Sequence, residues 1–260
     1  MMPLVQLPAA DIRGVFFDID DTLTTGGKLT PGAYAALERL RSAGKLVIAV
    51  TGRPAGWCDH IARMWPVDAV VGENGAFYFY YDETRKKLVK QFLLGEAARA
   101  ANRARLAAVR ERILNEVPGC AVASDQLYRE SDLAIDFSED VPRLPFGEVD
   151  RIVRIMQAAG MTAKVSSIHV NGWYGDYDKL GMTRRLMQER YGVDLDRDRA
   201  HYVFAGDSPN DAPLFKFFPH SVGMANIADF GARLADPPAY VTLARSGAGF
   251  VELVGRLLGG

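Results

Sequence analysis

The sequence has few of the features that mark secreted or membrane-bound proteins. Its 260 residues include only two cysteines, Cys58 and Cys120, which are too few for a disulfide framework and lack the spacing of metal ligands. No apolar run reaches the roughly 18 residues that span a bilayer. The first residues do not form a basic segment followed by an apolar stretch, as a secretory signal would. We therefore expect a cytoplasmic protein with reduced thiols and no membrane partner.

An excess of charge is missing as well. The chain has 31 Lys and Arg against 32 Asp and Glu, a formal net charge of −1, which gives no electrostatic support for binding nucleic acid or a membrane surface. Hydrophobic residues make up 48% of the chain, enough for a sizeable core at this length. We expect a globular protein, and its composition leaves both a monomer and a homodimer open.

Strands and helices alternate in the first part of the chain. Apolar runs predict strands at Ile12–Ile19, Leu46–Val50 and Val67–Val71, with helices between them at about residues 30–42 and 55–64. This order predicts a parallel sheet with right-handed crossovers, whose ligands bind at the carboxyl ends of its strands. The same alternation returns after Lys179, with a further strand predicted at Tyr202–Ala205.

The middle of the chain breaks this rhythm. A hairpin, a long helix at about Glu96–Glu116 and several short strands and helices predict an α+β insertion with a sheet of its own. We therefore predict an α/β fold with two domains. Residues 1–82 and 175–260 would form a discontinuous core domain, and residues 83–174 the inserted domain.

Two clusters of carboxylates each follow a predicted strand. Asp18-Ile-Asp20-Asp-Thr ends the first strand, and Gly-Asp207-Ser-Pro-Asn210-Asp211 follows the strand at Tyr202–Ala205. Burying unpaired negative charge is costly, so the two clusters suggest a shared cation. Hard oxygen ligands favour Mg²⁺, and Asp207 is the best contributor from the second cluster.

Phosphoryl transfer is a reaction that such a site can perform. An Asp carboxylate can attack phosphorus to give an aspartyl-phosphate, which water then hydrolyses, if the protein neutralises charge and places a proton donor near the leaving oxygen. Thr51 and the backbone N–H groups of the loop that begins at Gly52 would bind phosphate oxygens. The ammonium of Lys179 would neutralise the phosphate or the nucleophile.

These segments, in this order, resemble the four motifs of the haloacid dehalogenase superfamily of phosphohydrolases. Asp-Ile-Asp-Asp-Thr resembles the first motif, Val50-Thr51-Gly52-Arg53 the second, Lys179 the third and Gly-Asp-Ser-Pro-Asn-Asp the fourth. The resemblance covers essentially the whole predicted core and implies a Rossmann-like core. It also implies a role for each matching residue: Asp18 as nucleophile; Asp20 as general acid and base; Thr51, Gly52, Lys179 and Asn210 around the phosphoryl group; the carboxylates of Asp18 and Asp207 with the carbonyl of Asp20 around Mg²⁺; and Asp211 orienting Lys179 or metal-bound water.

The insertion lies between the second and third motifs, which is similar to the placement of the C2B-type cap. That subgroup includes Cof-type sugar phosphatases, sucrose-phosphate phosphatase and phosphomannomutase. Many relatives have Lys-Gly at the third motif, whereas this chain has Lys179-Leu180-Gly181. Lys164, inside the insertion, is the alternative to Lys179.

Polar residues of the predicted cap are candidates for substrate recognition. Arg129, His169 and Asn171 could face the cleft, where Arg129 would clamp a second anionic group. The alternative is that they are ordinary polar residues of the cap. Asp21 we interpret as a solvated or turn residue without a catalytic role.

Together these patterns predict a Mg²⁺-dependent phosphomonoester hydrolase. Its substrate would be a small phosphorylated metabolite, with a sugar phosphate favoured, and the cap would close over it and exclude water. Two alternatives stay open: a phosphosugar mutase on the same scaffold, and a protein that binds a phosphometabolite without turnover.

Overall fold

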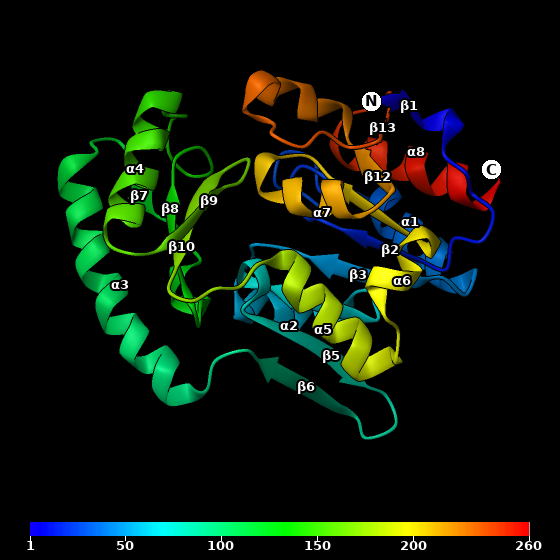
Figure 1. Ribbon diagram of the computed structural model, residues 1–260, viewed down its shortest axis with the longest axis horizontal. Coiled ribbons are helices and arrows are strands. Elements are labelled where there is room, and N and C mark those ends of the chain that lie inside the picture. Colours follow the sequence, from blue (N-terminus) through cyan, green and yellow to red (C-terminus); the bar gives the residue numbers. More distant parts are fainter. Residues whose placement is uncertain (260) are drawn as a thin grey trace.

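Two separate β-sheets organise the chain in the computed structural model, which describes residues 1–259. The large sheet has nine strands in the order β1-β13-β12-β11-β2-β3-β4-β5-β6, and the small sheet has four in the order β7-β8-β10-β9. Figure 1 shows the small sheet and its two helices to one side of the large sheet. The predicted α/β fold, with a mainly parallel central sheet and an inserted second sheet, is confirmed.

The large sheet is parallel from β1 to β4 and antiparallel beyond it. Its strands are β1 (Met2–Pro3), β13 (Tyr240–Val241), β12 (His220–Gly223), β11 (Tyr202–Gly206), β2 (Gly14–Phe17), β3 (Leu46–Val50), β4 (Ala69–Gly72), β5 (Phe77–Asp82) and β6 (Lys87–Phe92). The central strands are short apolar runs because both of their faces are covered.

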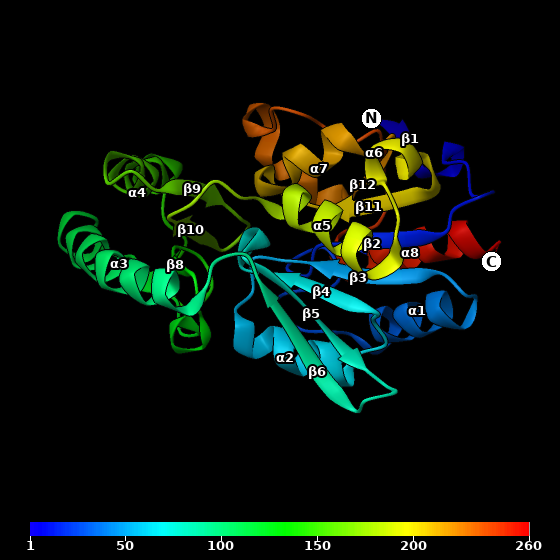
Figure 2. The ribbon, with the colours of Figure 1, turned by 60° about the horizontal axis from the view of Figure 1, so that its bottom comes forward.

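Helices cover the two faces of this sheet. Side chains alternate along β2, so that Val15 and Phe17 face one layer and Phe16 the other. The first layer contains α1 (Pro31–Ser42), α2 (Ala55–Met64) and α8 (Ser246–Leu258); the second contains α5 (Lys179–Tyr191), α6 (Leu195–Asp198) and α7 (Ala212–Phe217). Figure 2 shows the sheet between the two layers.

The order β11-β2-β3 is what positions the site. These three strands are parallel neighbours, with Phe17 paired to Ala205 on one side and to Ala49 on the other. The residues that follow each strand therefore emerge at the same edge of the sheet.

The small sheet is antiparallel and has one apolar face and one polar face. It consists of β7 (Ala121–Val122), β8 (Asp132–Asp136), β10 (His169–Trp173) and β9 (Thr162–Val165), and α3 (Glu96–Glu116) and α4 (Phe146–Ala158) pack on it. Leu133, Ile135 and Val170 join these helices in an apolar core. The alternate positions, which include Asp132 and Asn171, point away from that core and are buried.

The predicted hairpin between β5 and β6 extends the large sheet. Lys87–Phe92 pairs with Phe77–Asp82, so a segment that the predicted boundary assigned to the insertion belongs to the nine-stranded sheet. We propose that the inserted domain begins after Phe92. Among the described residues, no helix combines the length and the apolar character that crossing a membrane requires.

Within the core, a glycine lies in close backbone contact with the segment that returns from the insertion. Gly75 has φ 108°, and a Cβ at this position would lie 2.0 Å from the carbonyl oxygen of Asp178. We expect Gly75→Ala to lower the free energy of unfolding by about 3 kcal/mol, from left-handed strain and overpacking. Gly44→Ala is the control, because Gly44 has φ 71° but open space around it, and should cost about 1 kcal/mol. Urea denaturation measures both, and equal losses would contradict the close contact.

Candidate active site

The two carboxylate clusters meet at the edge where β2 and β11 end. Asp18 follows β2, and its N–H donates to the carbonyl of Ala205 at 2.9 Å. Asp18, Asp207 and Asp211 are buried, and carboxylate oxygens of all three lie within 4.8 Å of one another. The structure therefore brings together residues that are far apart in the sequence, as predicted from the strand ends.

Lys179 bridges this cluster. It is the first residue of α5, which Asp178 caps by accepting from the N–H of Gly181 at 2.7 Å. The Lys179 Nζ lies 2.9 Å from Asp18 Oδ1 and 2.7 Å from Asp211 Oδ1. Lys164, the alternative, lies on β9 in the small sheet. The contacts therefore favour Lys179 for the role that the third motif implies.

Both carboxylate oxygens of Asp211 accept hydrogen bonds from neighbouring groups. Its Oδ1 accepts from Lys179, and its Oδ2 accepts from the N–H groups of Asp207 and Ser208 at 3.1 and 3.4 Å. Asn210 Oδ1 accepts from Ser208 Oγ at 2.8 Å. Asp211 is thus placed to orient Lys179, and Asn210 supports the loop.

Asp207 is held by two side chains, and one of them, Asn226, lies outside the four motifs. Its Oδ1 accepts from Thr22 Oγ1 at 3.3 Å, and its Oδ2 accepts from Asn226 Nδ2 at 3.2 Å. Asn226 follows β12, the next parallel strand beyond β11. The signal that could have identified Asn226 is an amide shortly after the residues that form β12, at the same edge of the sheet.

The electrostatics of the cluster favour a cation. Burial raises the pKa of Asp18 to about 7, although Lys179 opposes this. Burial and the nearby charges of Asp18 and Asp211 raise the pKa of Asp207 well above its usual range. Burial alone would lower the pKa of Lys179, but the two carboxylates outweigh it and raise that pKa, so the side chain stays an ammonium. One ammonium faces three carboxylates, and this surplus of hard oxygen ligands fits a divalent cation such as Mg²⁺.

The loop after β3 carries Thr51 and Gly52. Thr51 is buried, and its Oγ1 accepts from the N–H of Arg53 at 3.1 Å. The carbonyl of Gly52 accepts from Arg129 Nη1 at 2.9 Å. The loop thus lies beside Asp18 at the sheet edge, and Arg129 of the inserted part binds its backbone.

Arg53 holds Asp20 in place. Its Nε lies 3.0 and 2.9 Å from the two Asp20 oxygens, and its Nη2 lies 2.7 Å from Asp20 Oδ1. The same buried guanidinium contacts two carboxylates of the insertion, Asp125 at 3.2 Å and Glu139 at 2.7 Å. Arg53 belongs to the second motif, although the motif by itself predicted no role for this side chain.

The three candidate substrate residues of the insertion bind protein carboxylates. Arg129 is buried and contacts Asp125 at 2.9 Å and Asp132 at 3.0 Å, so its guanidinium does not extend into open space as a clamp would. Asn171 Nδ2 donates to Asp132 at 3.0 Å, and His169 Nε2 lies 2.9 Å from Glu139. Direct contact between these residues and a substrate stays a prediction.

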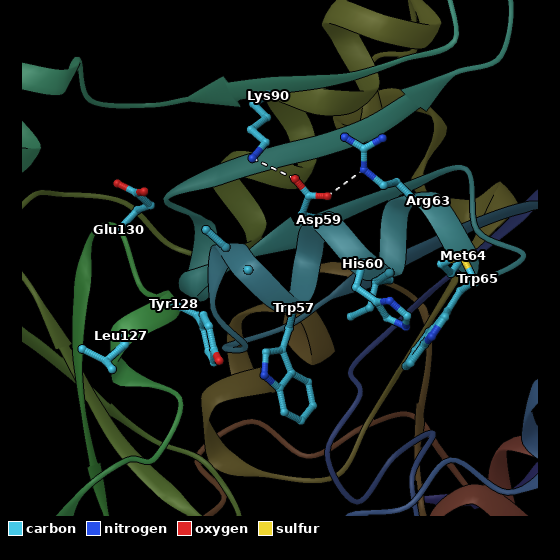
Figure 3. A pocket seen from close by; sticks show the side chains of 13 residues that line it. Trp57, Asp59, His60, Arg63, Met64, Trp65, Lys90, Leu127, Tyr128 and Glu130 are labelled. Atoms are coloured by element: carbon cyan, nitrogen blue, oxygen red, sulfur yellow. Dashed lines mark hydrogen bonds and ion pairs between the residues drawn. The ribbon is translucent and has the colours of Figure 1, made fainter.

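Two cavities lie near the junction of the two parts. One of about 340 Å³ is lined by Asp20, Arg53 and Glu139, among others. A wider groove of about 960 Å³ lies beside α2 (Figure 3), where Trp57 and Tyr128 project and Asp59 binds Lys90 and Arg63. None of the predicted site residues lines this groove, so the smaller cavity is the candidate active site.

The family comparison agrees with the motifs. Residues 15–104 match the family model described as haloacid dehalogenase-like hydrolase. This segment contains the first two motifs, and the resemblance stated from the sequence is confirmed. The search of the curated proteins gave no match.

Solved structures share the fold over nearly the whole chain. A protein from Thermoplasma acidophilum is 20% identical, covers 95% of this chain and 98% of its own, and has a TM-score of 0.67. A HAD/COF-like hydrolase from Plasmodium vivax is 16% identical over 96% of each chain, with a TM-score of 0.69. The sucrose-phosphatase of Synechocystis, in complex with sucrose and phosphate, is 13% identical over 95% of this chain and 98% of its own, with a TM-score of 0.62.

The bridge made by Lys179 predicts a large loss of stability when it is removed. Lys179→Met leaves Asp18 and Asp211 buried without their cation, and we expect the free energy of unfolding to fall by about 3–5 kcal/mol at neutral pH without divalent metal. Adding Asp211→Asn should recover part of the loss. Lys164→Met is the control and should change stability by less than about 0.5 kcal/mol. Similar losses for the two single variants, measured by urea denaturation, would contradict the bridge.

Proposed function

We propose that this haloacid dehalogenase-like chain is a phosphatase that hydrolyses phosphomonoesters through an aspartyl-phosphate on Asp18. The observation that carries the proposal is the Lys179 ammonium, which lies between Asp18 and Asp211 at the edge where β2, β3 and β11 end. Asp18 is buried, is aligned by the Lys179 ammonium and lies beside the loop that carries Thr51. These are the surroundings that a nucleophile toward phosphorus needs.

The first half-reaction transfers the phosphoryl group to the protein. An Asp18 oxygen forms a bond to phosphorus while the bond from phosphorus to the leaving oxygen breaks. Lys179 and Thr51 bind the phosphoryl oxygens and neutralise their charge. Asp20 gives a proton to the leaving oxygen, and the Arg53 fork keeps the Asp20 carboxyl in position for this.

The second half-reaction regenerates the carboxylate. Water attacks phosphorus and gives its proton to Asp20, the bond between Asp18 and phosphorus breaks, and orthophosphate leaves. Asp18, Asp207 and the carbonyl of Asp20 would hold Mg²⁺, which when bound supplies further charge neutralisation for the phosphoryl oxygens. Asp211 keeps Lys179 aligned through both steps.

We propose a small phosphorylated metabolite as the substrate and favour a sugar phosphate. The cavity of about 340 Å³ beside Asp20 is lined mainly by polar residues from both parts of the chain, which suits a small hydrophilic leaving group. Two structures that share the fold are described as a sucrose-phosphatase and as a trehalose-6-phosphate phosphatase related protein. Location in the cytoplasm and the choice between monomer and homodimer stay predictions.

A panel of phosphate esters tests the reaction. We expect release of phosphate from phosphorylated sugars or polyols with Mg²⁺, loss of release with chelator, and a loss of at least about a thousandfold in kcat for Asp18→Asn. Activity that requires a sugar bisphosphate would favour the mutase. Mg²⁺ binding without turnover of any ester would favour a non-catalytic binding protein and contradict the proposal.

The raised carboxyl pKa values predict that Mg²⁺ binding depends on pH. Burial raises the pKa of Asp18 to about 7 and raises that of Asp207 well above its usual range, so Mg²⁺ must displace protons when the pH is below about 7. We expect the dissociation constant to rise by about tenfold per displaced proton for each pH unit below 7. Calorimetry at pH 6 and pH 8 should show weaker binding and proton release at pH 6. Equal affinity without proton release would contradict this.

A further inference from the structure

The cavity beside Asp20 is bounded by the loop after β2 on one side and by two loops of the inserted part on the other. Its lining includes Asp21, Thr24, Gly26 and Gly27 from the core, and Ser138, Glu139, Arg143 and Ser167 from the insertion. At about 340 Å³ it is at the lower end of the usual range for small-molecule sites, about 300–1,000 Å³. Because Asp20 would give its proton to the leaving oxygen, this cavity is where the leaving group of a phosphomonoester would lie.

Asp21 is held in this lining by a strained backbone. Its φ of 54° lies in the left-handed region, which is unfavourable for a residue with a side chain. Two hydrogen bonds fix it there: its N–H donates to Thr24 Oγ1 at 3.2 Å, and its carbonyl accepts from Asn226 Nδ2 at 3.0 Å. Such strain persists where the surroundings impose it, and it is frequent at functional sites. Asp21 is therefore a fixed part of the cavity, and it lies in a turn, as expected from the sequence.

Ser167 belongs to the part of the lining that the insertion contributes, and its hydroxyl lies near the Asp21 carboxyl. The residue is 7% exposed, and its Oγ has no hydrogen-bond partner within 3.5 Å among residues 1–259. A buried hydroxyl without a partner is unfavourable. A hydroxyl group of a bound molecule beside Ser167 and Asp21 can donate its one proton to the Asp21 carboxylate and accept a hydrogen bond from Ser167 Oγ.

The rest of the lining restricts the chemistry of the leaving group. No aromatic side chain of the described residues lines the cavity, so a nucleobase would have no ring on which to stack. Three carboxyl groups face two guanidiniums, and one of these, Arg53, already binds Asp20 and Glu139. A second anionic group on the substrate would therefore meet the Asp21 carboxyl, with only Arg143 left to attract it.

We propose that Asp21 and Ser167 are specificity-determining residues that bind hydroxyl groups of a neutral leaving group and select against a leaving group that carries a carboxylate. This inference rests on the proposed phosphatase function and adds to it the residues that choose the substrate. The Asp21 carboxylate would accept a hydrogen bond from an alcohol group of the leaving group. It would repel a carboxylate at the same position.

Two matched pairs of esters test this: glycerol phosphate with phosphoglycerate, and sorbitol phosphate with phosphogluconate, in each of which an alcohol is exchanged for a carboxylate. We expect wild-type kcat/KM to favour the neutral member of a pair by at least about tenfold. Asp21→Asn should reduce this preference by about tenfold, chiefly through KM of the acidic member. Ser167→Ala should lower kcat/KM for the neutral member by about tenfold, and Ser167→Thr should restore it.

Two further variants separate specificity from folding. Asp21→Gly suits the left-handed backbone, so it should lose the preference while the protein stays at least as stable as the wild type. Asp11→Asn is the matched control, because Asp11 also has a positive φ, 63°, but is exposed and lies before β2, at the opposite end of that strand. It should leave the preference unchanged.

The outcomes are distinguishable. An unchanged preference in active Asp21→Asn protein, or a wild-type preference for the acidic members, would overturn the inference and, in the second case, assign recognition to Arg143. Turnover of p-nitrophenyl phosphate but of neither pair would overturn it as well. Absence of any turnover, p-nitrophenyl phosphate included, would instead remove the proposed function on which it rests.

Discussion

Uncompensated negative charge at the edge of a parallel sheet is the constraint on which this structure depends. Three buried carboxylates follow β2 and β11, and Lys179 is the ammonium that lies among them. The helix that carries Lys179 begins where the chain returns from the insertion, so the charge balance of the site requires that both halves of the core are assembled. Because one ammonium does not balance three carboxylates, the site favours a second cation, which the proposed Mg²⁺ would supply.

Charge also ties the insertion to the site. Arg53 from the core binds Asp125 and Glu139, while Arg129 from the insertion binds the carbonyl of Gly52. Glu73 strengthens this junction by accepting from the N–H groups of Glu130 and Ser131. The loop that would bind phosphate and the residue that would donate a proton are thus both positioned by the inserted part, which relates the placement of the cap to the chemistry.

The sequence allowed the core of the site to be predicted because local patterns decide it. A carboxylate after a buried strand must emerge at the carboxyl edge, and parallel neighbours share that edge, so Asp18 and Asp207 could be placed together. The partners of Arg129 and Asn171 could not be predicted in this way, because each depends on a cross-strand or interdomain contact with Asp132 or Gly52. The choice between Lys179 and Lys164 also needed the folded chain. The left-handed backbone of Asp21 has no marker in the sequence, since Asp is common in ordinary turns.

The most direct test of the central claim is to find the phosphoryl group on the protein. A substrate from the panel is mixed with enzyme and Mg²⁺, the reaction is quenched in acid during turnover, and the peptide that contains Asp18 is examined by mass spectrometry. The account predicts one added phosphoryl group on the Asp18 carboxyl, and none when the variant Asp18→Asn is used. Phosphate release without phosphorylation of this peptide, or with the group on another residue, would contradict the assignment of Asp18 as the nucleophile.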